Sequence, residues 1–384
     1  MKFEFATATR IIFGPGTLQE IGPLAAELGK RALLIGGSTP TRLTPLQELL
    51  QAQGITTTIF SVPGEPTVDL VLAGVQQAHA DACDFVIGMG GGSVIDTGKA
   101  IAALLTNPGE PLDYLEVVGR GQALSRASAP CIAIPTTAGT GAEVTRNAVL
   151  GAPEHHVKVS MRSPSMLPTL ALIDPELTYG LPPDVTASTG LDALTQCMEP
   201  YVSNKANPLT DALCREGMQR AARSLRRAFQ QGSDPAARAD MAVAGLCGGL
   251  ALANAKLGAV HGFAGPLGGM FPVPHGVVCA RLLPLVMATN VRALQERAPD
   301  APMLARYDEI ARIVTGDPTA RAADGVAWVQ ALGNELHVPP LARFGVTAAD
   351  IPKVIPKAQR AGSMQGNPLV LTPEELTQIL QQAL

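Results

Sequence analysis

The sequence predicts two domains: an N-terminal α/β domain built on a parallel sheet, and a C-terminal domain that is all helical. Three observations lead to this prediction. The chain has 384 residues, more than one ordinary compact core holds. Residues 10–175 alternate short β-rich runs with helical patterns, as parallel sheets do. Beyond residue 182, long amphipathic segments replace the β-branched runs.

The strands of the first domain are expected where apolar runs end in Gly, Pro or Thr. Five runs fit this description: 31–37, 56–62, 83–90, 130–137 and 170–175. Helices are expected at 44–54 and 68–80, where apolar residues recur at three- and four-residue spacing. Ligands of such sheets bind beyond the carboxyl ends of the strands.

The second domain is expected to begin at Pro182-Pro183-Asp184, because proline suits a first helical turn and aspartate can cap one. The predicted domains are therefore residues 1–182 and 183–384. Within the second, the clearest helical patterns cover 208–231, 234–256 and 320–336.

The composition excludes several classes of function. Hydrophobic residues make up 46%, charged residues 16% and the net charge is -4, which indicates a globular protein with no basic surface for nucleic acid. Neither a signal peptide nor an apolar run of membrane-spanning length is present, so no membrane association is expected. The six cysteines form no CxxC pair and indicate reduced thiols in a cytoplasmic protein.

The glycine-rich stretch "GMGGGSVIDTGKA", residues 88–100, is the first candidate binding site. It fails the P-loop pattern, because Ser93 stands where the first glycine is needed and Ala100 follows the lysine. It is also a poor dinucleotide fingerprint. Three glycines and a serine that open a helix can still bind a diphosphate through backbone amides. The alternative is a plain strand-to-helix turn.

A second candidate site joins residues of the helical half. Asp192 and Gln196 are one helical turn apart and share a face. His261 and His275 each precede a glycine. A carboxylate with two imidazoles is a recognised set for zinc or ferrous iron with an open position. Each histidine alone is more typical of a satisfied, partly buried side chain than of a ligand, and only the combination favours a metal.

Four motifs occur together, in this order: "GGGSVIDTGKA", "IPTTAGTGAEVT" (134–145), "TGLDALTQCMEPYVS" (189–203) and "VHGFAGPLGGMFPVPHG" (260–276). In order and spacing the chain resembles the iron-containing (group III) alcohol dehydrogenases over practically its whole length. The resemblance implies a dehydroquinate synthase-like architecture. A Rossmann-like domain would bind NAD or NADP, a helical domain would hold a divalent metal, Fe or Zn, and the substrate would lie between them.

The resemblance also implies the metal ligands. Asp192, His261 and His275 would hold the cation and serve catalysis, and Gln196 stands where the family normally has a fourth ligand, a histidine. Glutamine is a poorer ligand than imidazole, so this position is a departure. Gly265 is another, because many relatives have a histidine there that helps to pass the proton.

For the cofactor, the resemblance implies a set of residues around the glycine stretch. They are Gly90, Gly91, Gly92 and Ser93 at the diphosphate, Asp96 in the next turn, Thr136 and Thr137 at the nucleotide, and Lys158 at the ribose. Asp96 and Lys99 are equally an ordinary solvated helical pair. The first predicted strand ends at Gly37 and Ser38 without an acid to repel a 2′-phosphate, which favours NADP over NAD.

These expectations describe a cytoplasmic, metal-dependent oxidoreductase that transfers hydride between NAD(P)(H) and a small alcohol or aldehyde, and that forms a homo-oligomer. Arg146, Asn147 and Arg162 follow the cofactor motifs and are compatible with a substrate that has an acid group, but the two arginines are equally structural ion pairs or solvated side chains. Three alternatives are a metal-independent enzyme like maleylacetate reductase, a lyase like dehydroquinate synthase, and a nucleotide-binding protein that has lost catalysis. The last is prompted by Gln196 and Gly265.

Overall fold

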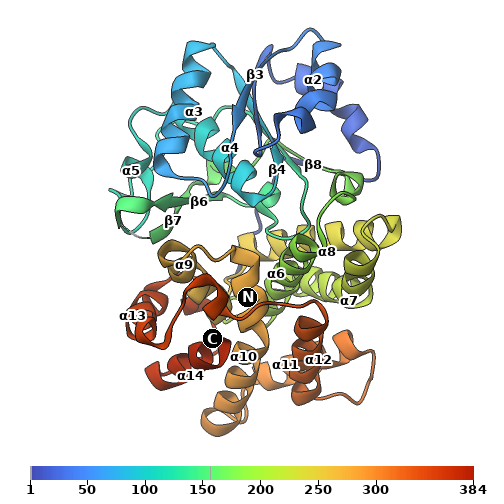
Figure 1. The fold of residues 1–384 in the computed structure, drawn as a ribbon, viewed down its shortest axis with the longest axis vertical. Coiled ribbons are helices and arrows are strands. Elements are labelled where there is room, and N and C mark those ends of the chain that lie inside the picture. The colour runs from blue at the N-terminus through green and yellow to red at the C-terminus, as the bar shows by residue number, and fades with distance from the viewer. Residues whose placement is uncertain (1, 156) are drawn as a thin grey trace. The chain divides into compact units, whose positions relative to one another are not determined.

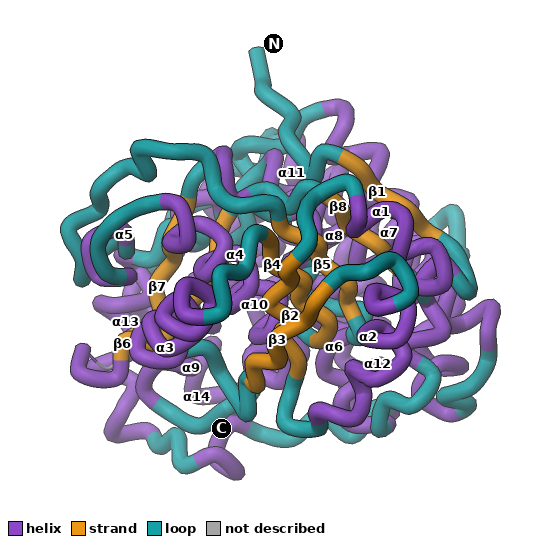
Figure 2. The backbone as a smooth tube through the Cα atoms, turned by 90° about the horizontal axis from the view of Figure 1, so that it is seen from above, coloured by secondary structure: helices purple, strands orange, loops and turns teal. Residues whose placement is uncertain are grey.

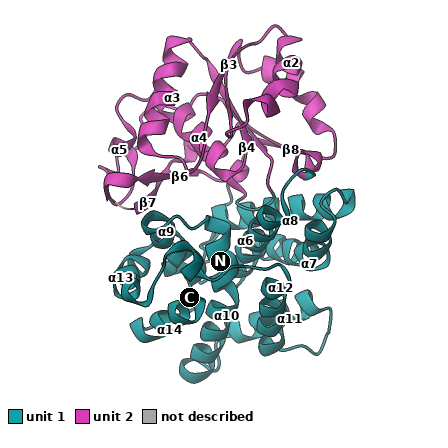
Figure 3. Ribbon diagram, viewed as in Figure 1, with its two compact units in different colours: residues 1–5, 138–140, 179–384 teal, residues 6–137, 141–178 magenta. Residues whose placement is uncertain are grey.

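The computed structural model of the chain describes residues 2–155 and 157–384 (Figure 1). The chain divides into two compact units, coloured separately in Figure 3. The sheet unit comprises Ala6–Thr137 and Gly141–Thr178. The helical unit comprises Tyr179–Leu384 with the short stretches Met1–Phe5 and Ala138–Thr140.

The sheet unit is built on a six-stranded sheet in the order β1-β8-β5-β4-β2-β3, with every neighbouring pair parallel. Its strands are β1 (Arg10–Phe13), β2 (Arg31–Gly36), β3 (Thr56–Ser61), β4 (Phe85–Gly90), β5 (Cys131–Pro135) and β8 (Leu170–Ile173). The five predicted strands are confirmed. The edge strand β1 was not predicted, because its four residues are only partly buried and form a strand by pairing with β8.

Helices cover both faces of this sheet. Figure 2 shows α1 (Ile21–Ala26) and α2 (Thr44–Gln51) on one side, and α3 (Val68–Ala80) and α4 (Gly92–Thr106) on the other. Successive strand residues therefore point into different cores: Leu34 packs in the cluster with α1 and α2, and Leu33 in the cluster with α3 and α4. Burial on both faces explains why β2, β4, β5 and β8 are largely apolar runs.

An antiparallel hairpin of β6 (Asn147–Ala152) and β7 (Val157–Arg162) forms a separate two-stranded sheet. The sequence did not predict it. The backbone amide of Val149 in β6 donates to Asp96 Oδ2 on α4 at 2.9 Å, so this hairpin is attached to the helix that follows the glycine stretch. The short helix α5 (Pro111–Tyr114) lies between α4 and β5 in the chain.

The described residues of the helical unit form helices and loops only. Its helices are α6 (Pro183–Val202), α7 (Pro208–Gln230), α8 (Pro235–Asn254), α9 (Ala259–Met270), α10 (His275–Arg297), α11 (Pro302–Thr315), α12 (Ala322–Glu335), α13 (Ile351–Arg360) and α14 (Pro373–Ala383). The three clearest predicted helices correspond to α7, α8 and α12. The predicted fold class, a parallel sheet followed by an all-helical region, is confirmed.

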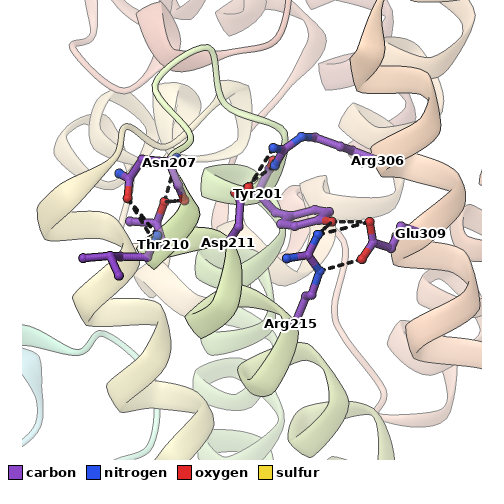
Figure 4. Close-up of polar contacts among 8 residues, drawn as sticks. Tyr201, Asn207, Thr210, Asp211, Arg215, Arg306 and Glu309 are labelled. Carbon is purple, nitrogen blue, oxygen red and sulfur yellow. Dashed lines mark hydrogen bonds and ion pairs between the residues drawn. The ribbon is translucent and has the colours of Figure 1, made fainter. Parts of the chain in front are cut away.

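A polar cluster fixes the end of α6 against α7 and α11 (Figure 4). Tyr201 on α6 lies between two guanidinium groups, with the Cζ atoms of Arg215 and Arg306 at 5.0 and 4.8 Å from its ring centre. The Tyr201 hydroxyl donates to Glu309 on α11, and Arg215 donates to both of these groups. Hydrogen bonding from Arg215 lowers the pKa of Glu309 below its ordinary value.

The same figure shows how α7 begins. Asn207 accepts hydrogen bonds from the backbone amides of Leu209 and Thr210, both at 3.2 Å, and Thr210 accepts one from the Asn207 amide at 3.1 Å. This capping box satisfies amides that the first helical turn leaves unpaired. One turn into the helix, Asp211 accepts from Arg306 at 2.8 and 2.7 Å, which joins α7 to α11.

Two helices among the described residues, α8 and α10, are long and apolar enough to cross a membrane by length and composition alone. Of their most apolar windows, 61% and 78% respectively are buried inside the structure. Core helices that are apolar on most sides have the same character, so these two are weak evidence for membrane spans.

Replacing Arg306 by Met removes the partner of Asp211, a carboxylate that is only 8% exposed. We expect the free energy of unfolding of the helical unit, measured by urea denaturation, to fall by about 3 kcal/mol. Arg306→Lys should recover only part of this loss, because an ammonium group cannot bind both carboxylate oxygens in a fork. The control is Arg343→Met, at an exposed arginine of the same unit, with an expected change below about 0.5 kcal/mol. Equal losses in the two Met variants would contradict the prediction.

Candidate functional site

Four side chains of the helical unit bring possible metal ligands to one point. They are Asp192 from α6, His261 from α9, and His275 and Cys279 from the first two turns of α10. One ligand atom from each lies within 4.8 Å of all the others. The structure therefore brings together three of the predicted residues and adds Cys279, to which the sequence analysis assigned no role.

The carboxylate is the centre of this cluster. Asp192 Oδ1 lies 3.4 Å from His261 Nε2 and 3.6 Å from His275 Nε2. Asp192 is 1% exposed, and its Oδ1 takes no hydrogen bond of good geometry from the described residues. A buried carboxylate oxygen without a donor is costly, and a cation at this point would satisfy it. The donor set therefore fits a divalent metal.

The charges of the cluster favour the ionised carboxylate. Burial by itself raises the pKa of Asp192, but the attraction of His275 and His261 outweighs it and brings the pKa below its ordinary value. Burial raises the pKa of the Cys279 thiol to about 12. A coordinated cation reverses that preference, because metal-bound cysteine is deprotonated.

Glu199 holds one of the imidazoles. Its carboxylate lies 2.7 Å from His261 Nδ1 through one oxygen and accepts from the Val260 amide at 2.7 Å through the other. With Nδ1 hydrogen-bonded to this carboxylate, Nε2 of His261 is the nitrogen directed at the cluster. The sequence analysis missed Glu199. The available signal was its position two turns after Asp192 on the same helix, which gives both carboxylates one face.

A glycine allows α10 to approach α6 closely enough for His275 to reach Asp192. A Cβ atom on Gly276 would lie 2.6 Å from the backbone oxygen of Ser188, a contact that real side chains essentially never make. The neighbouring Pro274 is the N-cap residue of α10 and fixes the approach of the chain.

Gln196, predicted as a weak fourth ligand, lies beside the cluster and contacts the carboxylate. Its Nε2 donates to Asp192 Oδ2 at 3.1 Å and to the Gly139 backbone oxygen at 3.2 Å. Both partners are acceptors, so the amide nitrogen must face them. Its Oε1 is buried and accepts no hydrogen bond from the described residues. Gln196 therefore orients Asp192, and direct coordination by its oxygen stays a prediction.

The predicted cofactor residues gather at one edge of the sheet unit. Strands β2, β4 and β5 are neighbours, and Thr136 donates its amide to the Gly90 oxygen at 2.9 Å. The segments that follow these three strands contain most of the predicted set: Gly37, Ser38, Gly90, Gly91, Gly92, Ser93, Thr136 and Thr137. Free amides at the start of α4 lie at the same edge, which suits a diphosphate.

In the turn from β4 to α4, one position must be glycine because any side chain there would clash. A Cβ atom on Gly90 would lie 2.6 Å from the Val94 side chain, which is buried in the first turn of α4. A Cβ atom on Gly91 would meet Thr137 only at 3.6 Å, an ordinary contact. Gly90 is thus needed for the tight turn from strand to helix, and Gly91 leaves room for a ligand to approach the backbone.

Asp96 and Lys158, also predicted at the cofactor, have protein partners. Asp96 Oδ1 pairs with Lys99 Nζ at 2.9 Å, and Lys158 pairs with Glu65 at 3.1 Å. The alternative that Asp96 and Lys99 form a solvated pair is wrong. Lys99 is 1% exposed and donates to the Ala142 backbone oxygen at 2.9 Å.

Comparison with known proteins tests the resemblance. Residues 8–175 match the family model described as iron-containing alcohol dehydrogenase, and residues 186–384 match the model of the C-terminal part of the Fe-containing alcohol dehydrogenase family. The chain belongs to the iron-containing alcohol dehydrogenase family.

Individual members of the family match along the whole chain. The 1,3-propanediol dehydrogenase of Klebsiella pneumoniae is 35% identical over 99% of this chain and 98% of its own length. A crystal structure of 1,3-propanediol oxidoreductase, 33% identical, covers 100% of both chains with a TM-score of 0.92. The sulfoacetaldehyde reductase of Bifidobacterium kashiwanohense, solved in complex with NAD+, is 28% identical with a TM-score of 0.88 and covers 100% of this chain and 99% of its own.

The protein is therefore an oxidoreductase of the iron-containing alcohol dehydrogenase family, in which dependence on NAD(P) is typical, and alcohols or aldehydes are the implied substrate class. The alternative of a metal-independent enzyme like maleylacetate reductase is not favoured by these relatives, nor is a nucleotide-binding protein without catalysis.

Glu199→Gln tests how His261 is held. Glu199 uses both oxygens as acceptors, whereas glutamine has one acceptor oxygen and an NH2 group that opposes one of the two N–H donors. We expect the affinity of the metal-stripped protein for Zn2+, measured by competition with a chelating dye, to fall about 10- to 100-fold. Glu296→Gln, at an exposed position of α10, is the matched control. The same affinity in both variants would show that Glu199 does not support the metal.

Proposed function

We propose that the chain is a metal-dependent alcohol dehydrogenase or aldehyde reductase whose cation is held by Asp192, His261 and His275. The observation that carries this proposal is the buried Oδ1 of Asp192, which lacks a hydrogen-bond donor among the described residues and lies beside two imidazole nitrogens. A carboxylate with two imidazoles suits Fe2+ or Zn2+ better than Ca2+ or Mg2+.

Each group has a separate part in this chemistry. A bound divalent cation supplies Lewis acidity toward the oxygen of an alcohol or aldehyde, where charge develops during hydride transfer. The nicotinamide cofactor supplies or accepts the hydride. Asp192 holds negative charge out of water next to the cation position, Gln196 donates to its other oxygen, and Glu199 keeps His261 in one orientation. Gly265 has no side chain to pass a proton, so the alcohol proton leaves by another route.

Removal of the metal tests the proposal. We expect chelation followed by gel filtration to lower the rate of NADPH oxidation with an aldehyde at least about 100-fold, because the lost Lewis acid contributes several kcal/mol. Zn2+ or Fe2+ should restore the rate in the original chain but not in Asp192→Asn.

The substrates for this test are short neutral aldehydes and aldehydes with a sulfonate or carboxylate. The acidic aldehydes are included because Arg146, next to the β6–β7 hairpin, is a residue type that pairs with acid groups. A relative is also named a sulfoacetaldehyde reductase. Arg162 pairs with Glu116 at 3.0 Å. Turnover that resists chelation would support the metal-independent alternative. Cofactor binding without turnover of any aldehyde would support the non-catalytic alternative.

We further propose that the cofactor is NADP. The strand β2 ends at Gly36 and is followed by Gly37 and Ser38, with no carboxylate to repel a 2′-phosphate. Ser38 and the nearby Arg42 are exposed, and both can donate hydrogen bonds to a phosphate.

Ser38→Asp places the missing carboxylate after β2. We expect kcat/KM for NADPH to fall about 10-fold, because two like charges about 4 Å apart repel by roughly 1–4 kcal/mol and about 1.4 kcal/mol is a factor of ten, while kcat/KM for NADH changes little. Ser233→Asp, at an exposed serine of the helical unit, controls for an added charge. An unchanged ratio of the two specificity constants would contradict the assignment of Ser38 to the ribose.

A cytoplasmic location and a homo-oligomer complete the proposal. All six cysteines are buried and none is paired in a disulfide, which supports a reducing compartment. The homo-oligomer stays a prediction from the resemblance.

A further inference from the structure

Cys279 has surroundings that a packed core cysteine does not require. It is fully buried, and its Sγ lies 3.7 Å from His261 Nε2 and 3.6 Å from His275 Nε2. These are the two nitrogens that also approach Asp192 Oδ1. The thiol is thus directed at the same point as the carboxylate and the two imidazoles.

The separations agree with four ligands around one zinc ion. With bonds of about 2.0 Å to nitrogen or oxygen and about 2.3 Å to sulfur, a tetrahedral site places its ligand atoms roughly 3.3–3.7 Å apart. The distances from Asp192 Oδ1 to the two imidazole nitrogens are 3.4 and 3.6 Å, and those from Cys279 Sγ are 3.7 and 3.6 Å. These distances cover four of the six edges of the tetrahedron, and all four ligand atoms lie within 4.8 Å of one another.

A second observation, independent of the cysteine, indicates a ligand at this point. Asp192 Oδ1 is buried and has no hydrogen-bond donor of good geometry among the described residues. Gln196 directs its amide nitrogen at Asp192 Oδ2 and the Gly139 oxygen, not at Oδ1. The groups that face Oδ1 are therefore the two imidazoles and Cys279.

We propose that Cys279 Sγ is a protein ligand of the cation held by Asp192, His261 and His275, and that this thiolate makes the site selective for Zn2+ over Fe2+. The inference rests on the proposed metal-dependent function, and it requires the substrate oxygen to bind as a fifth ligand, an expansion that catalytic zinc sites can make. When the Zn–S bond forms, the S–H bond breaks and its proton passes to solvent, with no change in oxidation state. Soft thiolate ligands favour zinc, whereas a set of imidazole and carboxylate alone is less selective.

Substitution with Co2+ tests directly whether Cys279 Sγ is a ligand. We expect the metal-stripped protein to bind one Co2+ and to show a near-ultraviolet thiolate-to-cobalt charge-transfer band in addition to the visible d–d bands. In Cys279→Ala the charge-transfer band should disappear while the visible bands remain. Cys247→Ala, at another buried cysteine of the helical unit, is the matched control and should keep both.

The affinity for Zn2+ gives a second readout that needs no catalysis. We expect Cys279→Ala to weaken Zn2+ binding by more than about 100-fold, beyond the 10- to 100-fold loss typical of a residue that only supports a ligand. The preference for Zn2+ over Fe2+ should fall in the same variant, and Cys247→Ala should retain both affinity and preference.

The outcomes separate this inference from the proposed function. Stoichiometric Co2+ binding without a charge-transfer band in the unmodified protein would overturn the thiolate ligand and leave the metal-dependent function standing. Failure to bind either Co2+ or Zn2+ would overturn both. The spectrum of the unmodified protein decides between these cases even if Cys279→Ala does not fold.

Discussion

The helical unit depends on one electrostatic constraint, a carboxylate held out of water that needs positive charge beside it. Asp192 is 1% exposed, and the groups around it are arranged to keep it ionised and oriented. Gln196 donates to one of its oxygens, and two imidazoles approach the other. Gly276 has no side chain, because α10 must pass close to α6 for this arrangement to form. A hydrophobic residue at position 192 would need none of these features.

The nucleotide edge consists mainly of backbone groups, and the metal cluster consists of side chains that are distant in sequence. This difference explains how far each site could be predicted. The nucleotide edge depends mainly on backbone amides, glycines and strand ends, all of which leave a local pattern in the sequence, as at Gly90 and Thr136. The wrong prediction at this edge concerns a side chain. Lys99 is polar and one turn from Asp96, so local spacing suggests a solvated pair, yet Ala142 and Thr145 enclose it from a distant part of the chain.

The metal cluster depends on contacts between residues far apart in sequence. Asp192, His261 and His275 could be predicted because their chemistry is unusual for a core and their motifs resemble a known family. Cys279 could not, because a buried cysteine in an apolar helix has the same local pattern whether it packs or coordinates. In the main sheet, β2, β4, β5 and β8 were predictable from buried apolar runs and β3 from its β-branched residues. The edge strand β1 and the β6–β7 hairpin form through pairing rather than through a strong apolar run.

The cluster draws its side chains from α6, α9 and α10, and a long segment of chain separates α6 from the other two helices. An ion bound there would cross-link these three helices, in addition to any part it has in hydride transfer. Because the unfolded chain cannot gather these groups, binding and folding are thermodynamically linked, and an ion present at 100 times its dissociation constant stabilises the fold by about 2.7 kcal/mol. Scarcity of such an ion in the cell would therefore reduce the amount of folded protein.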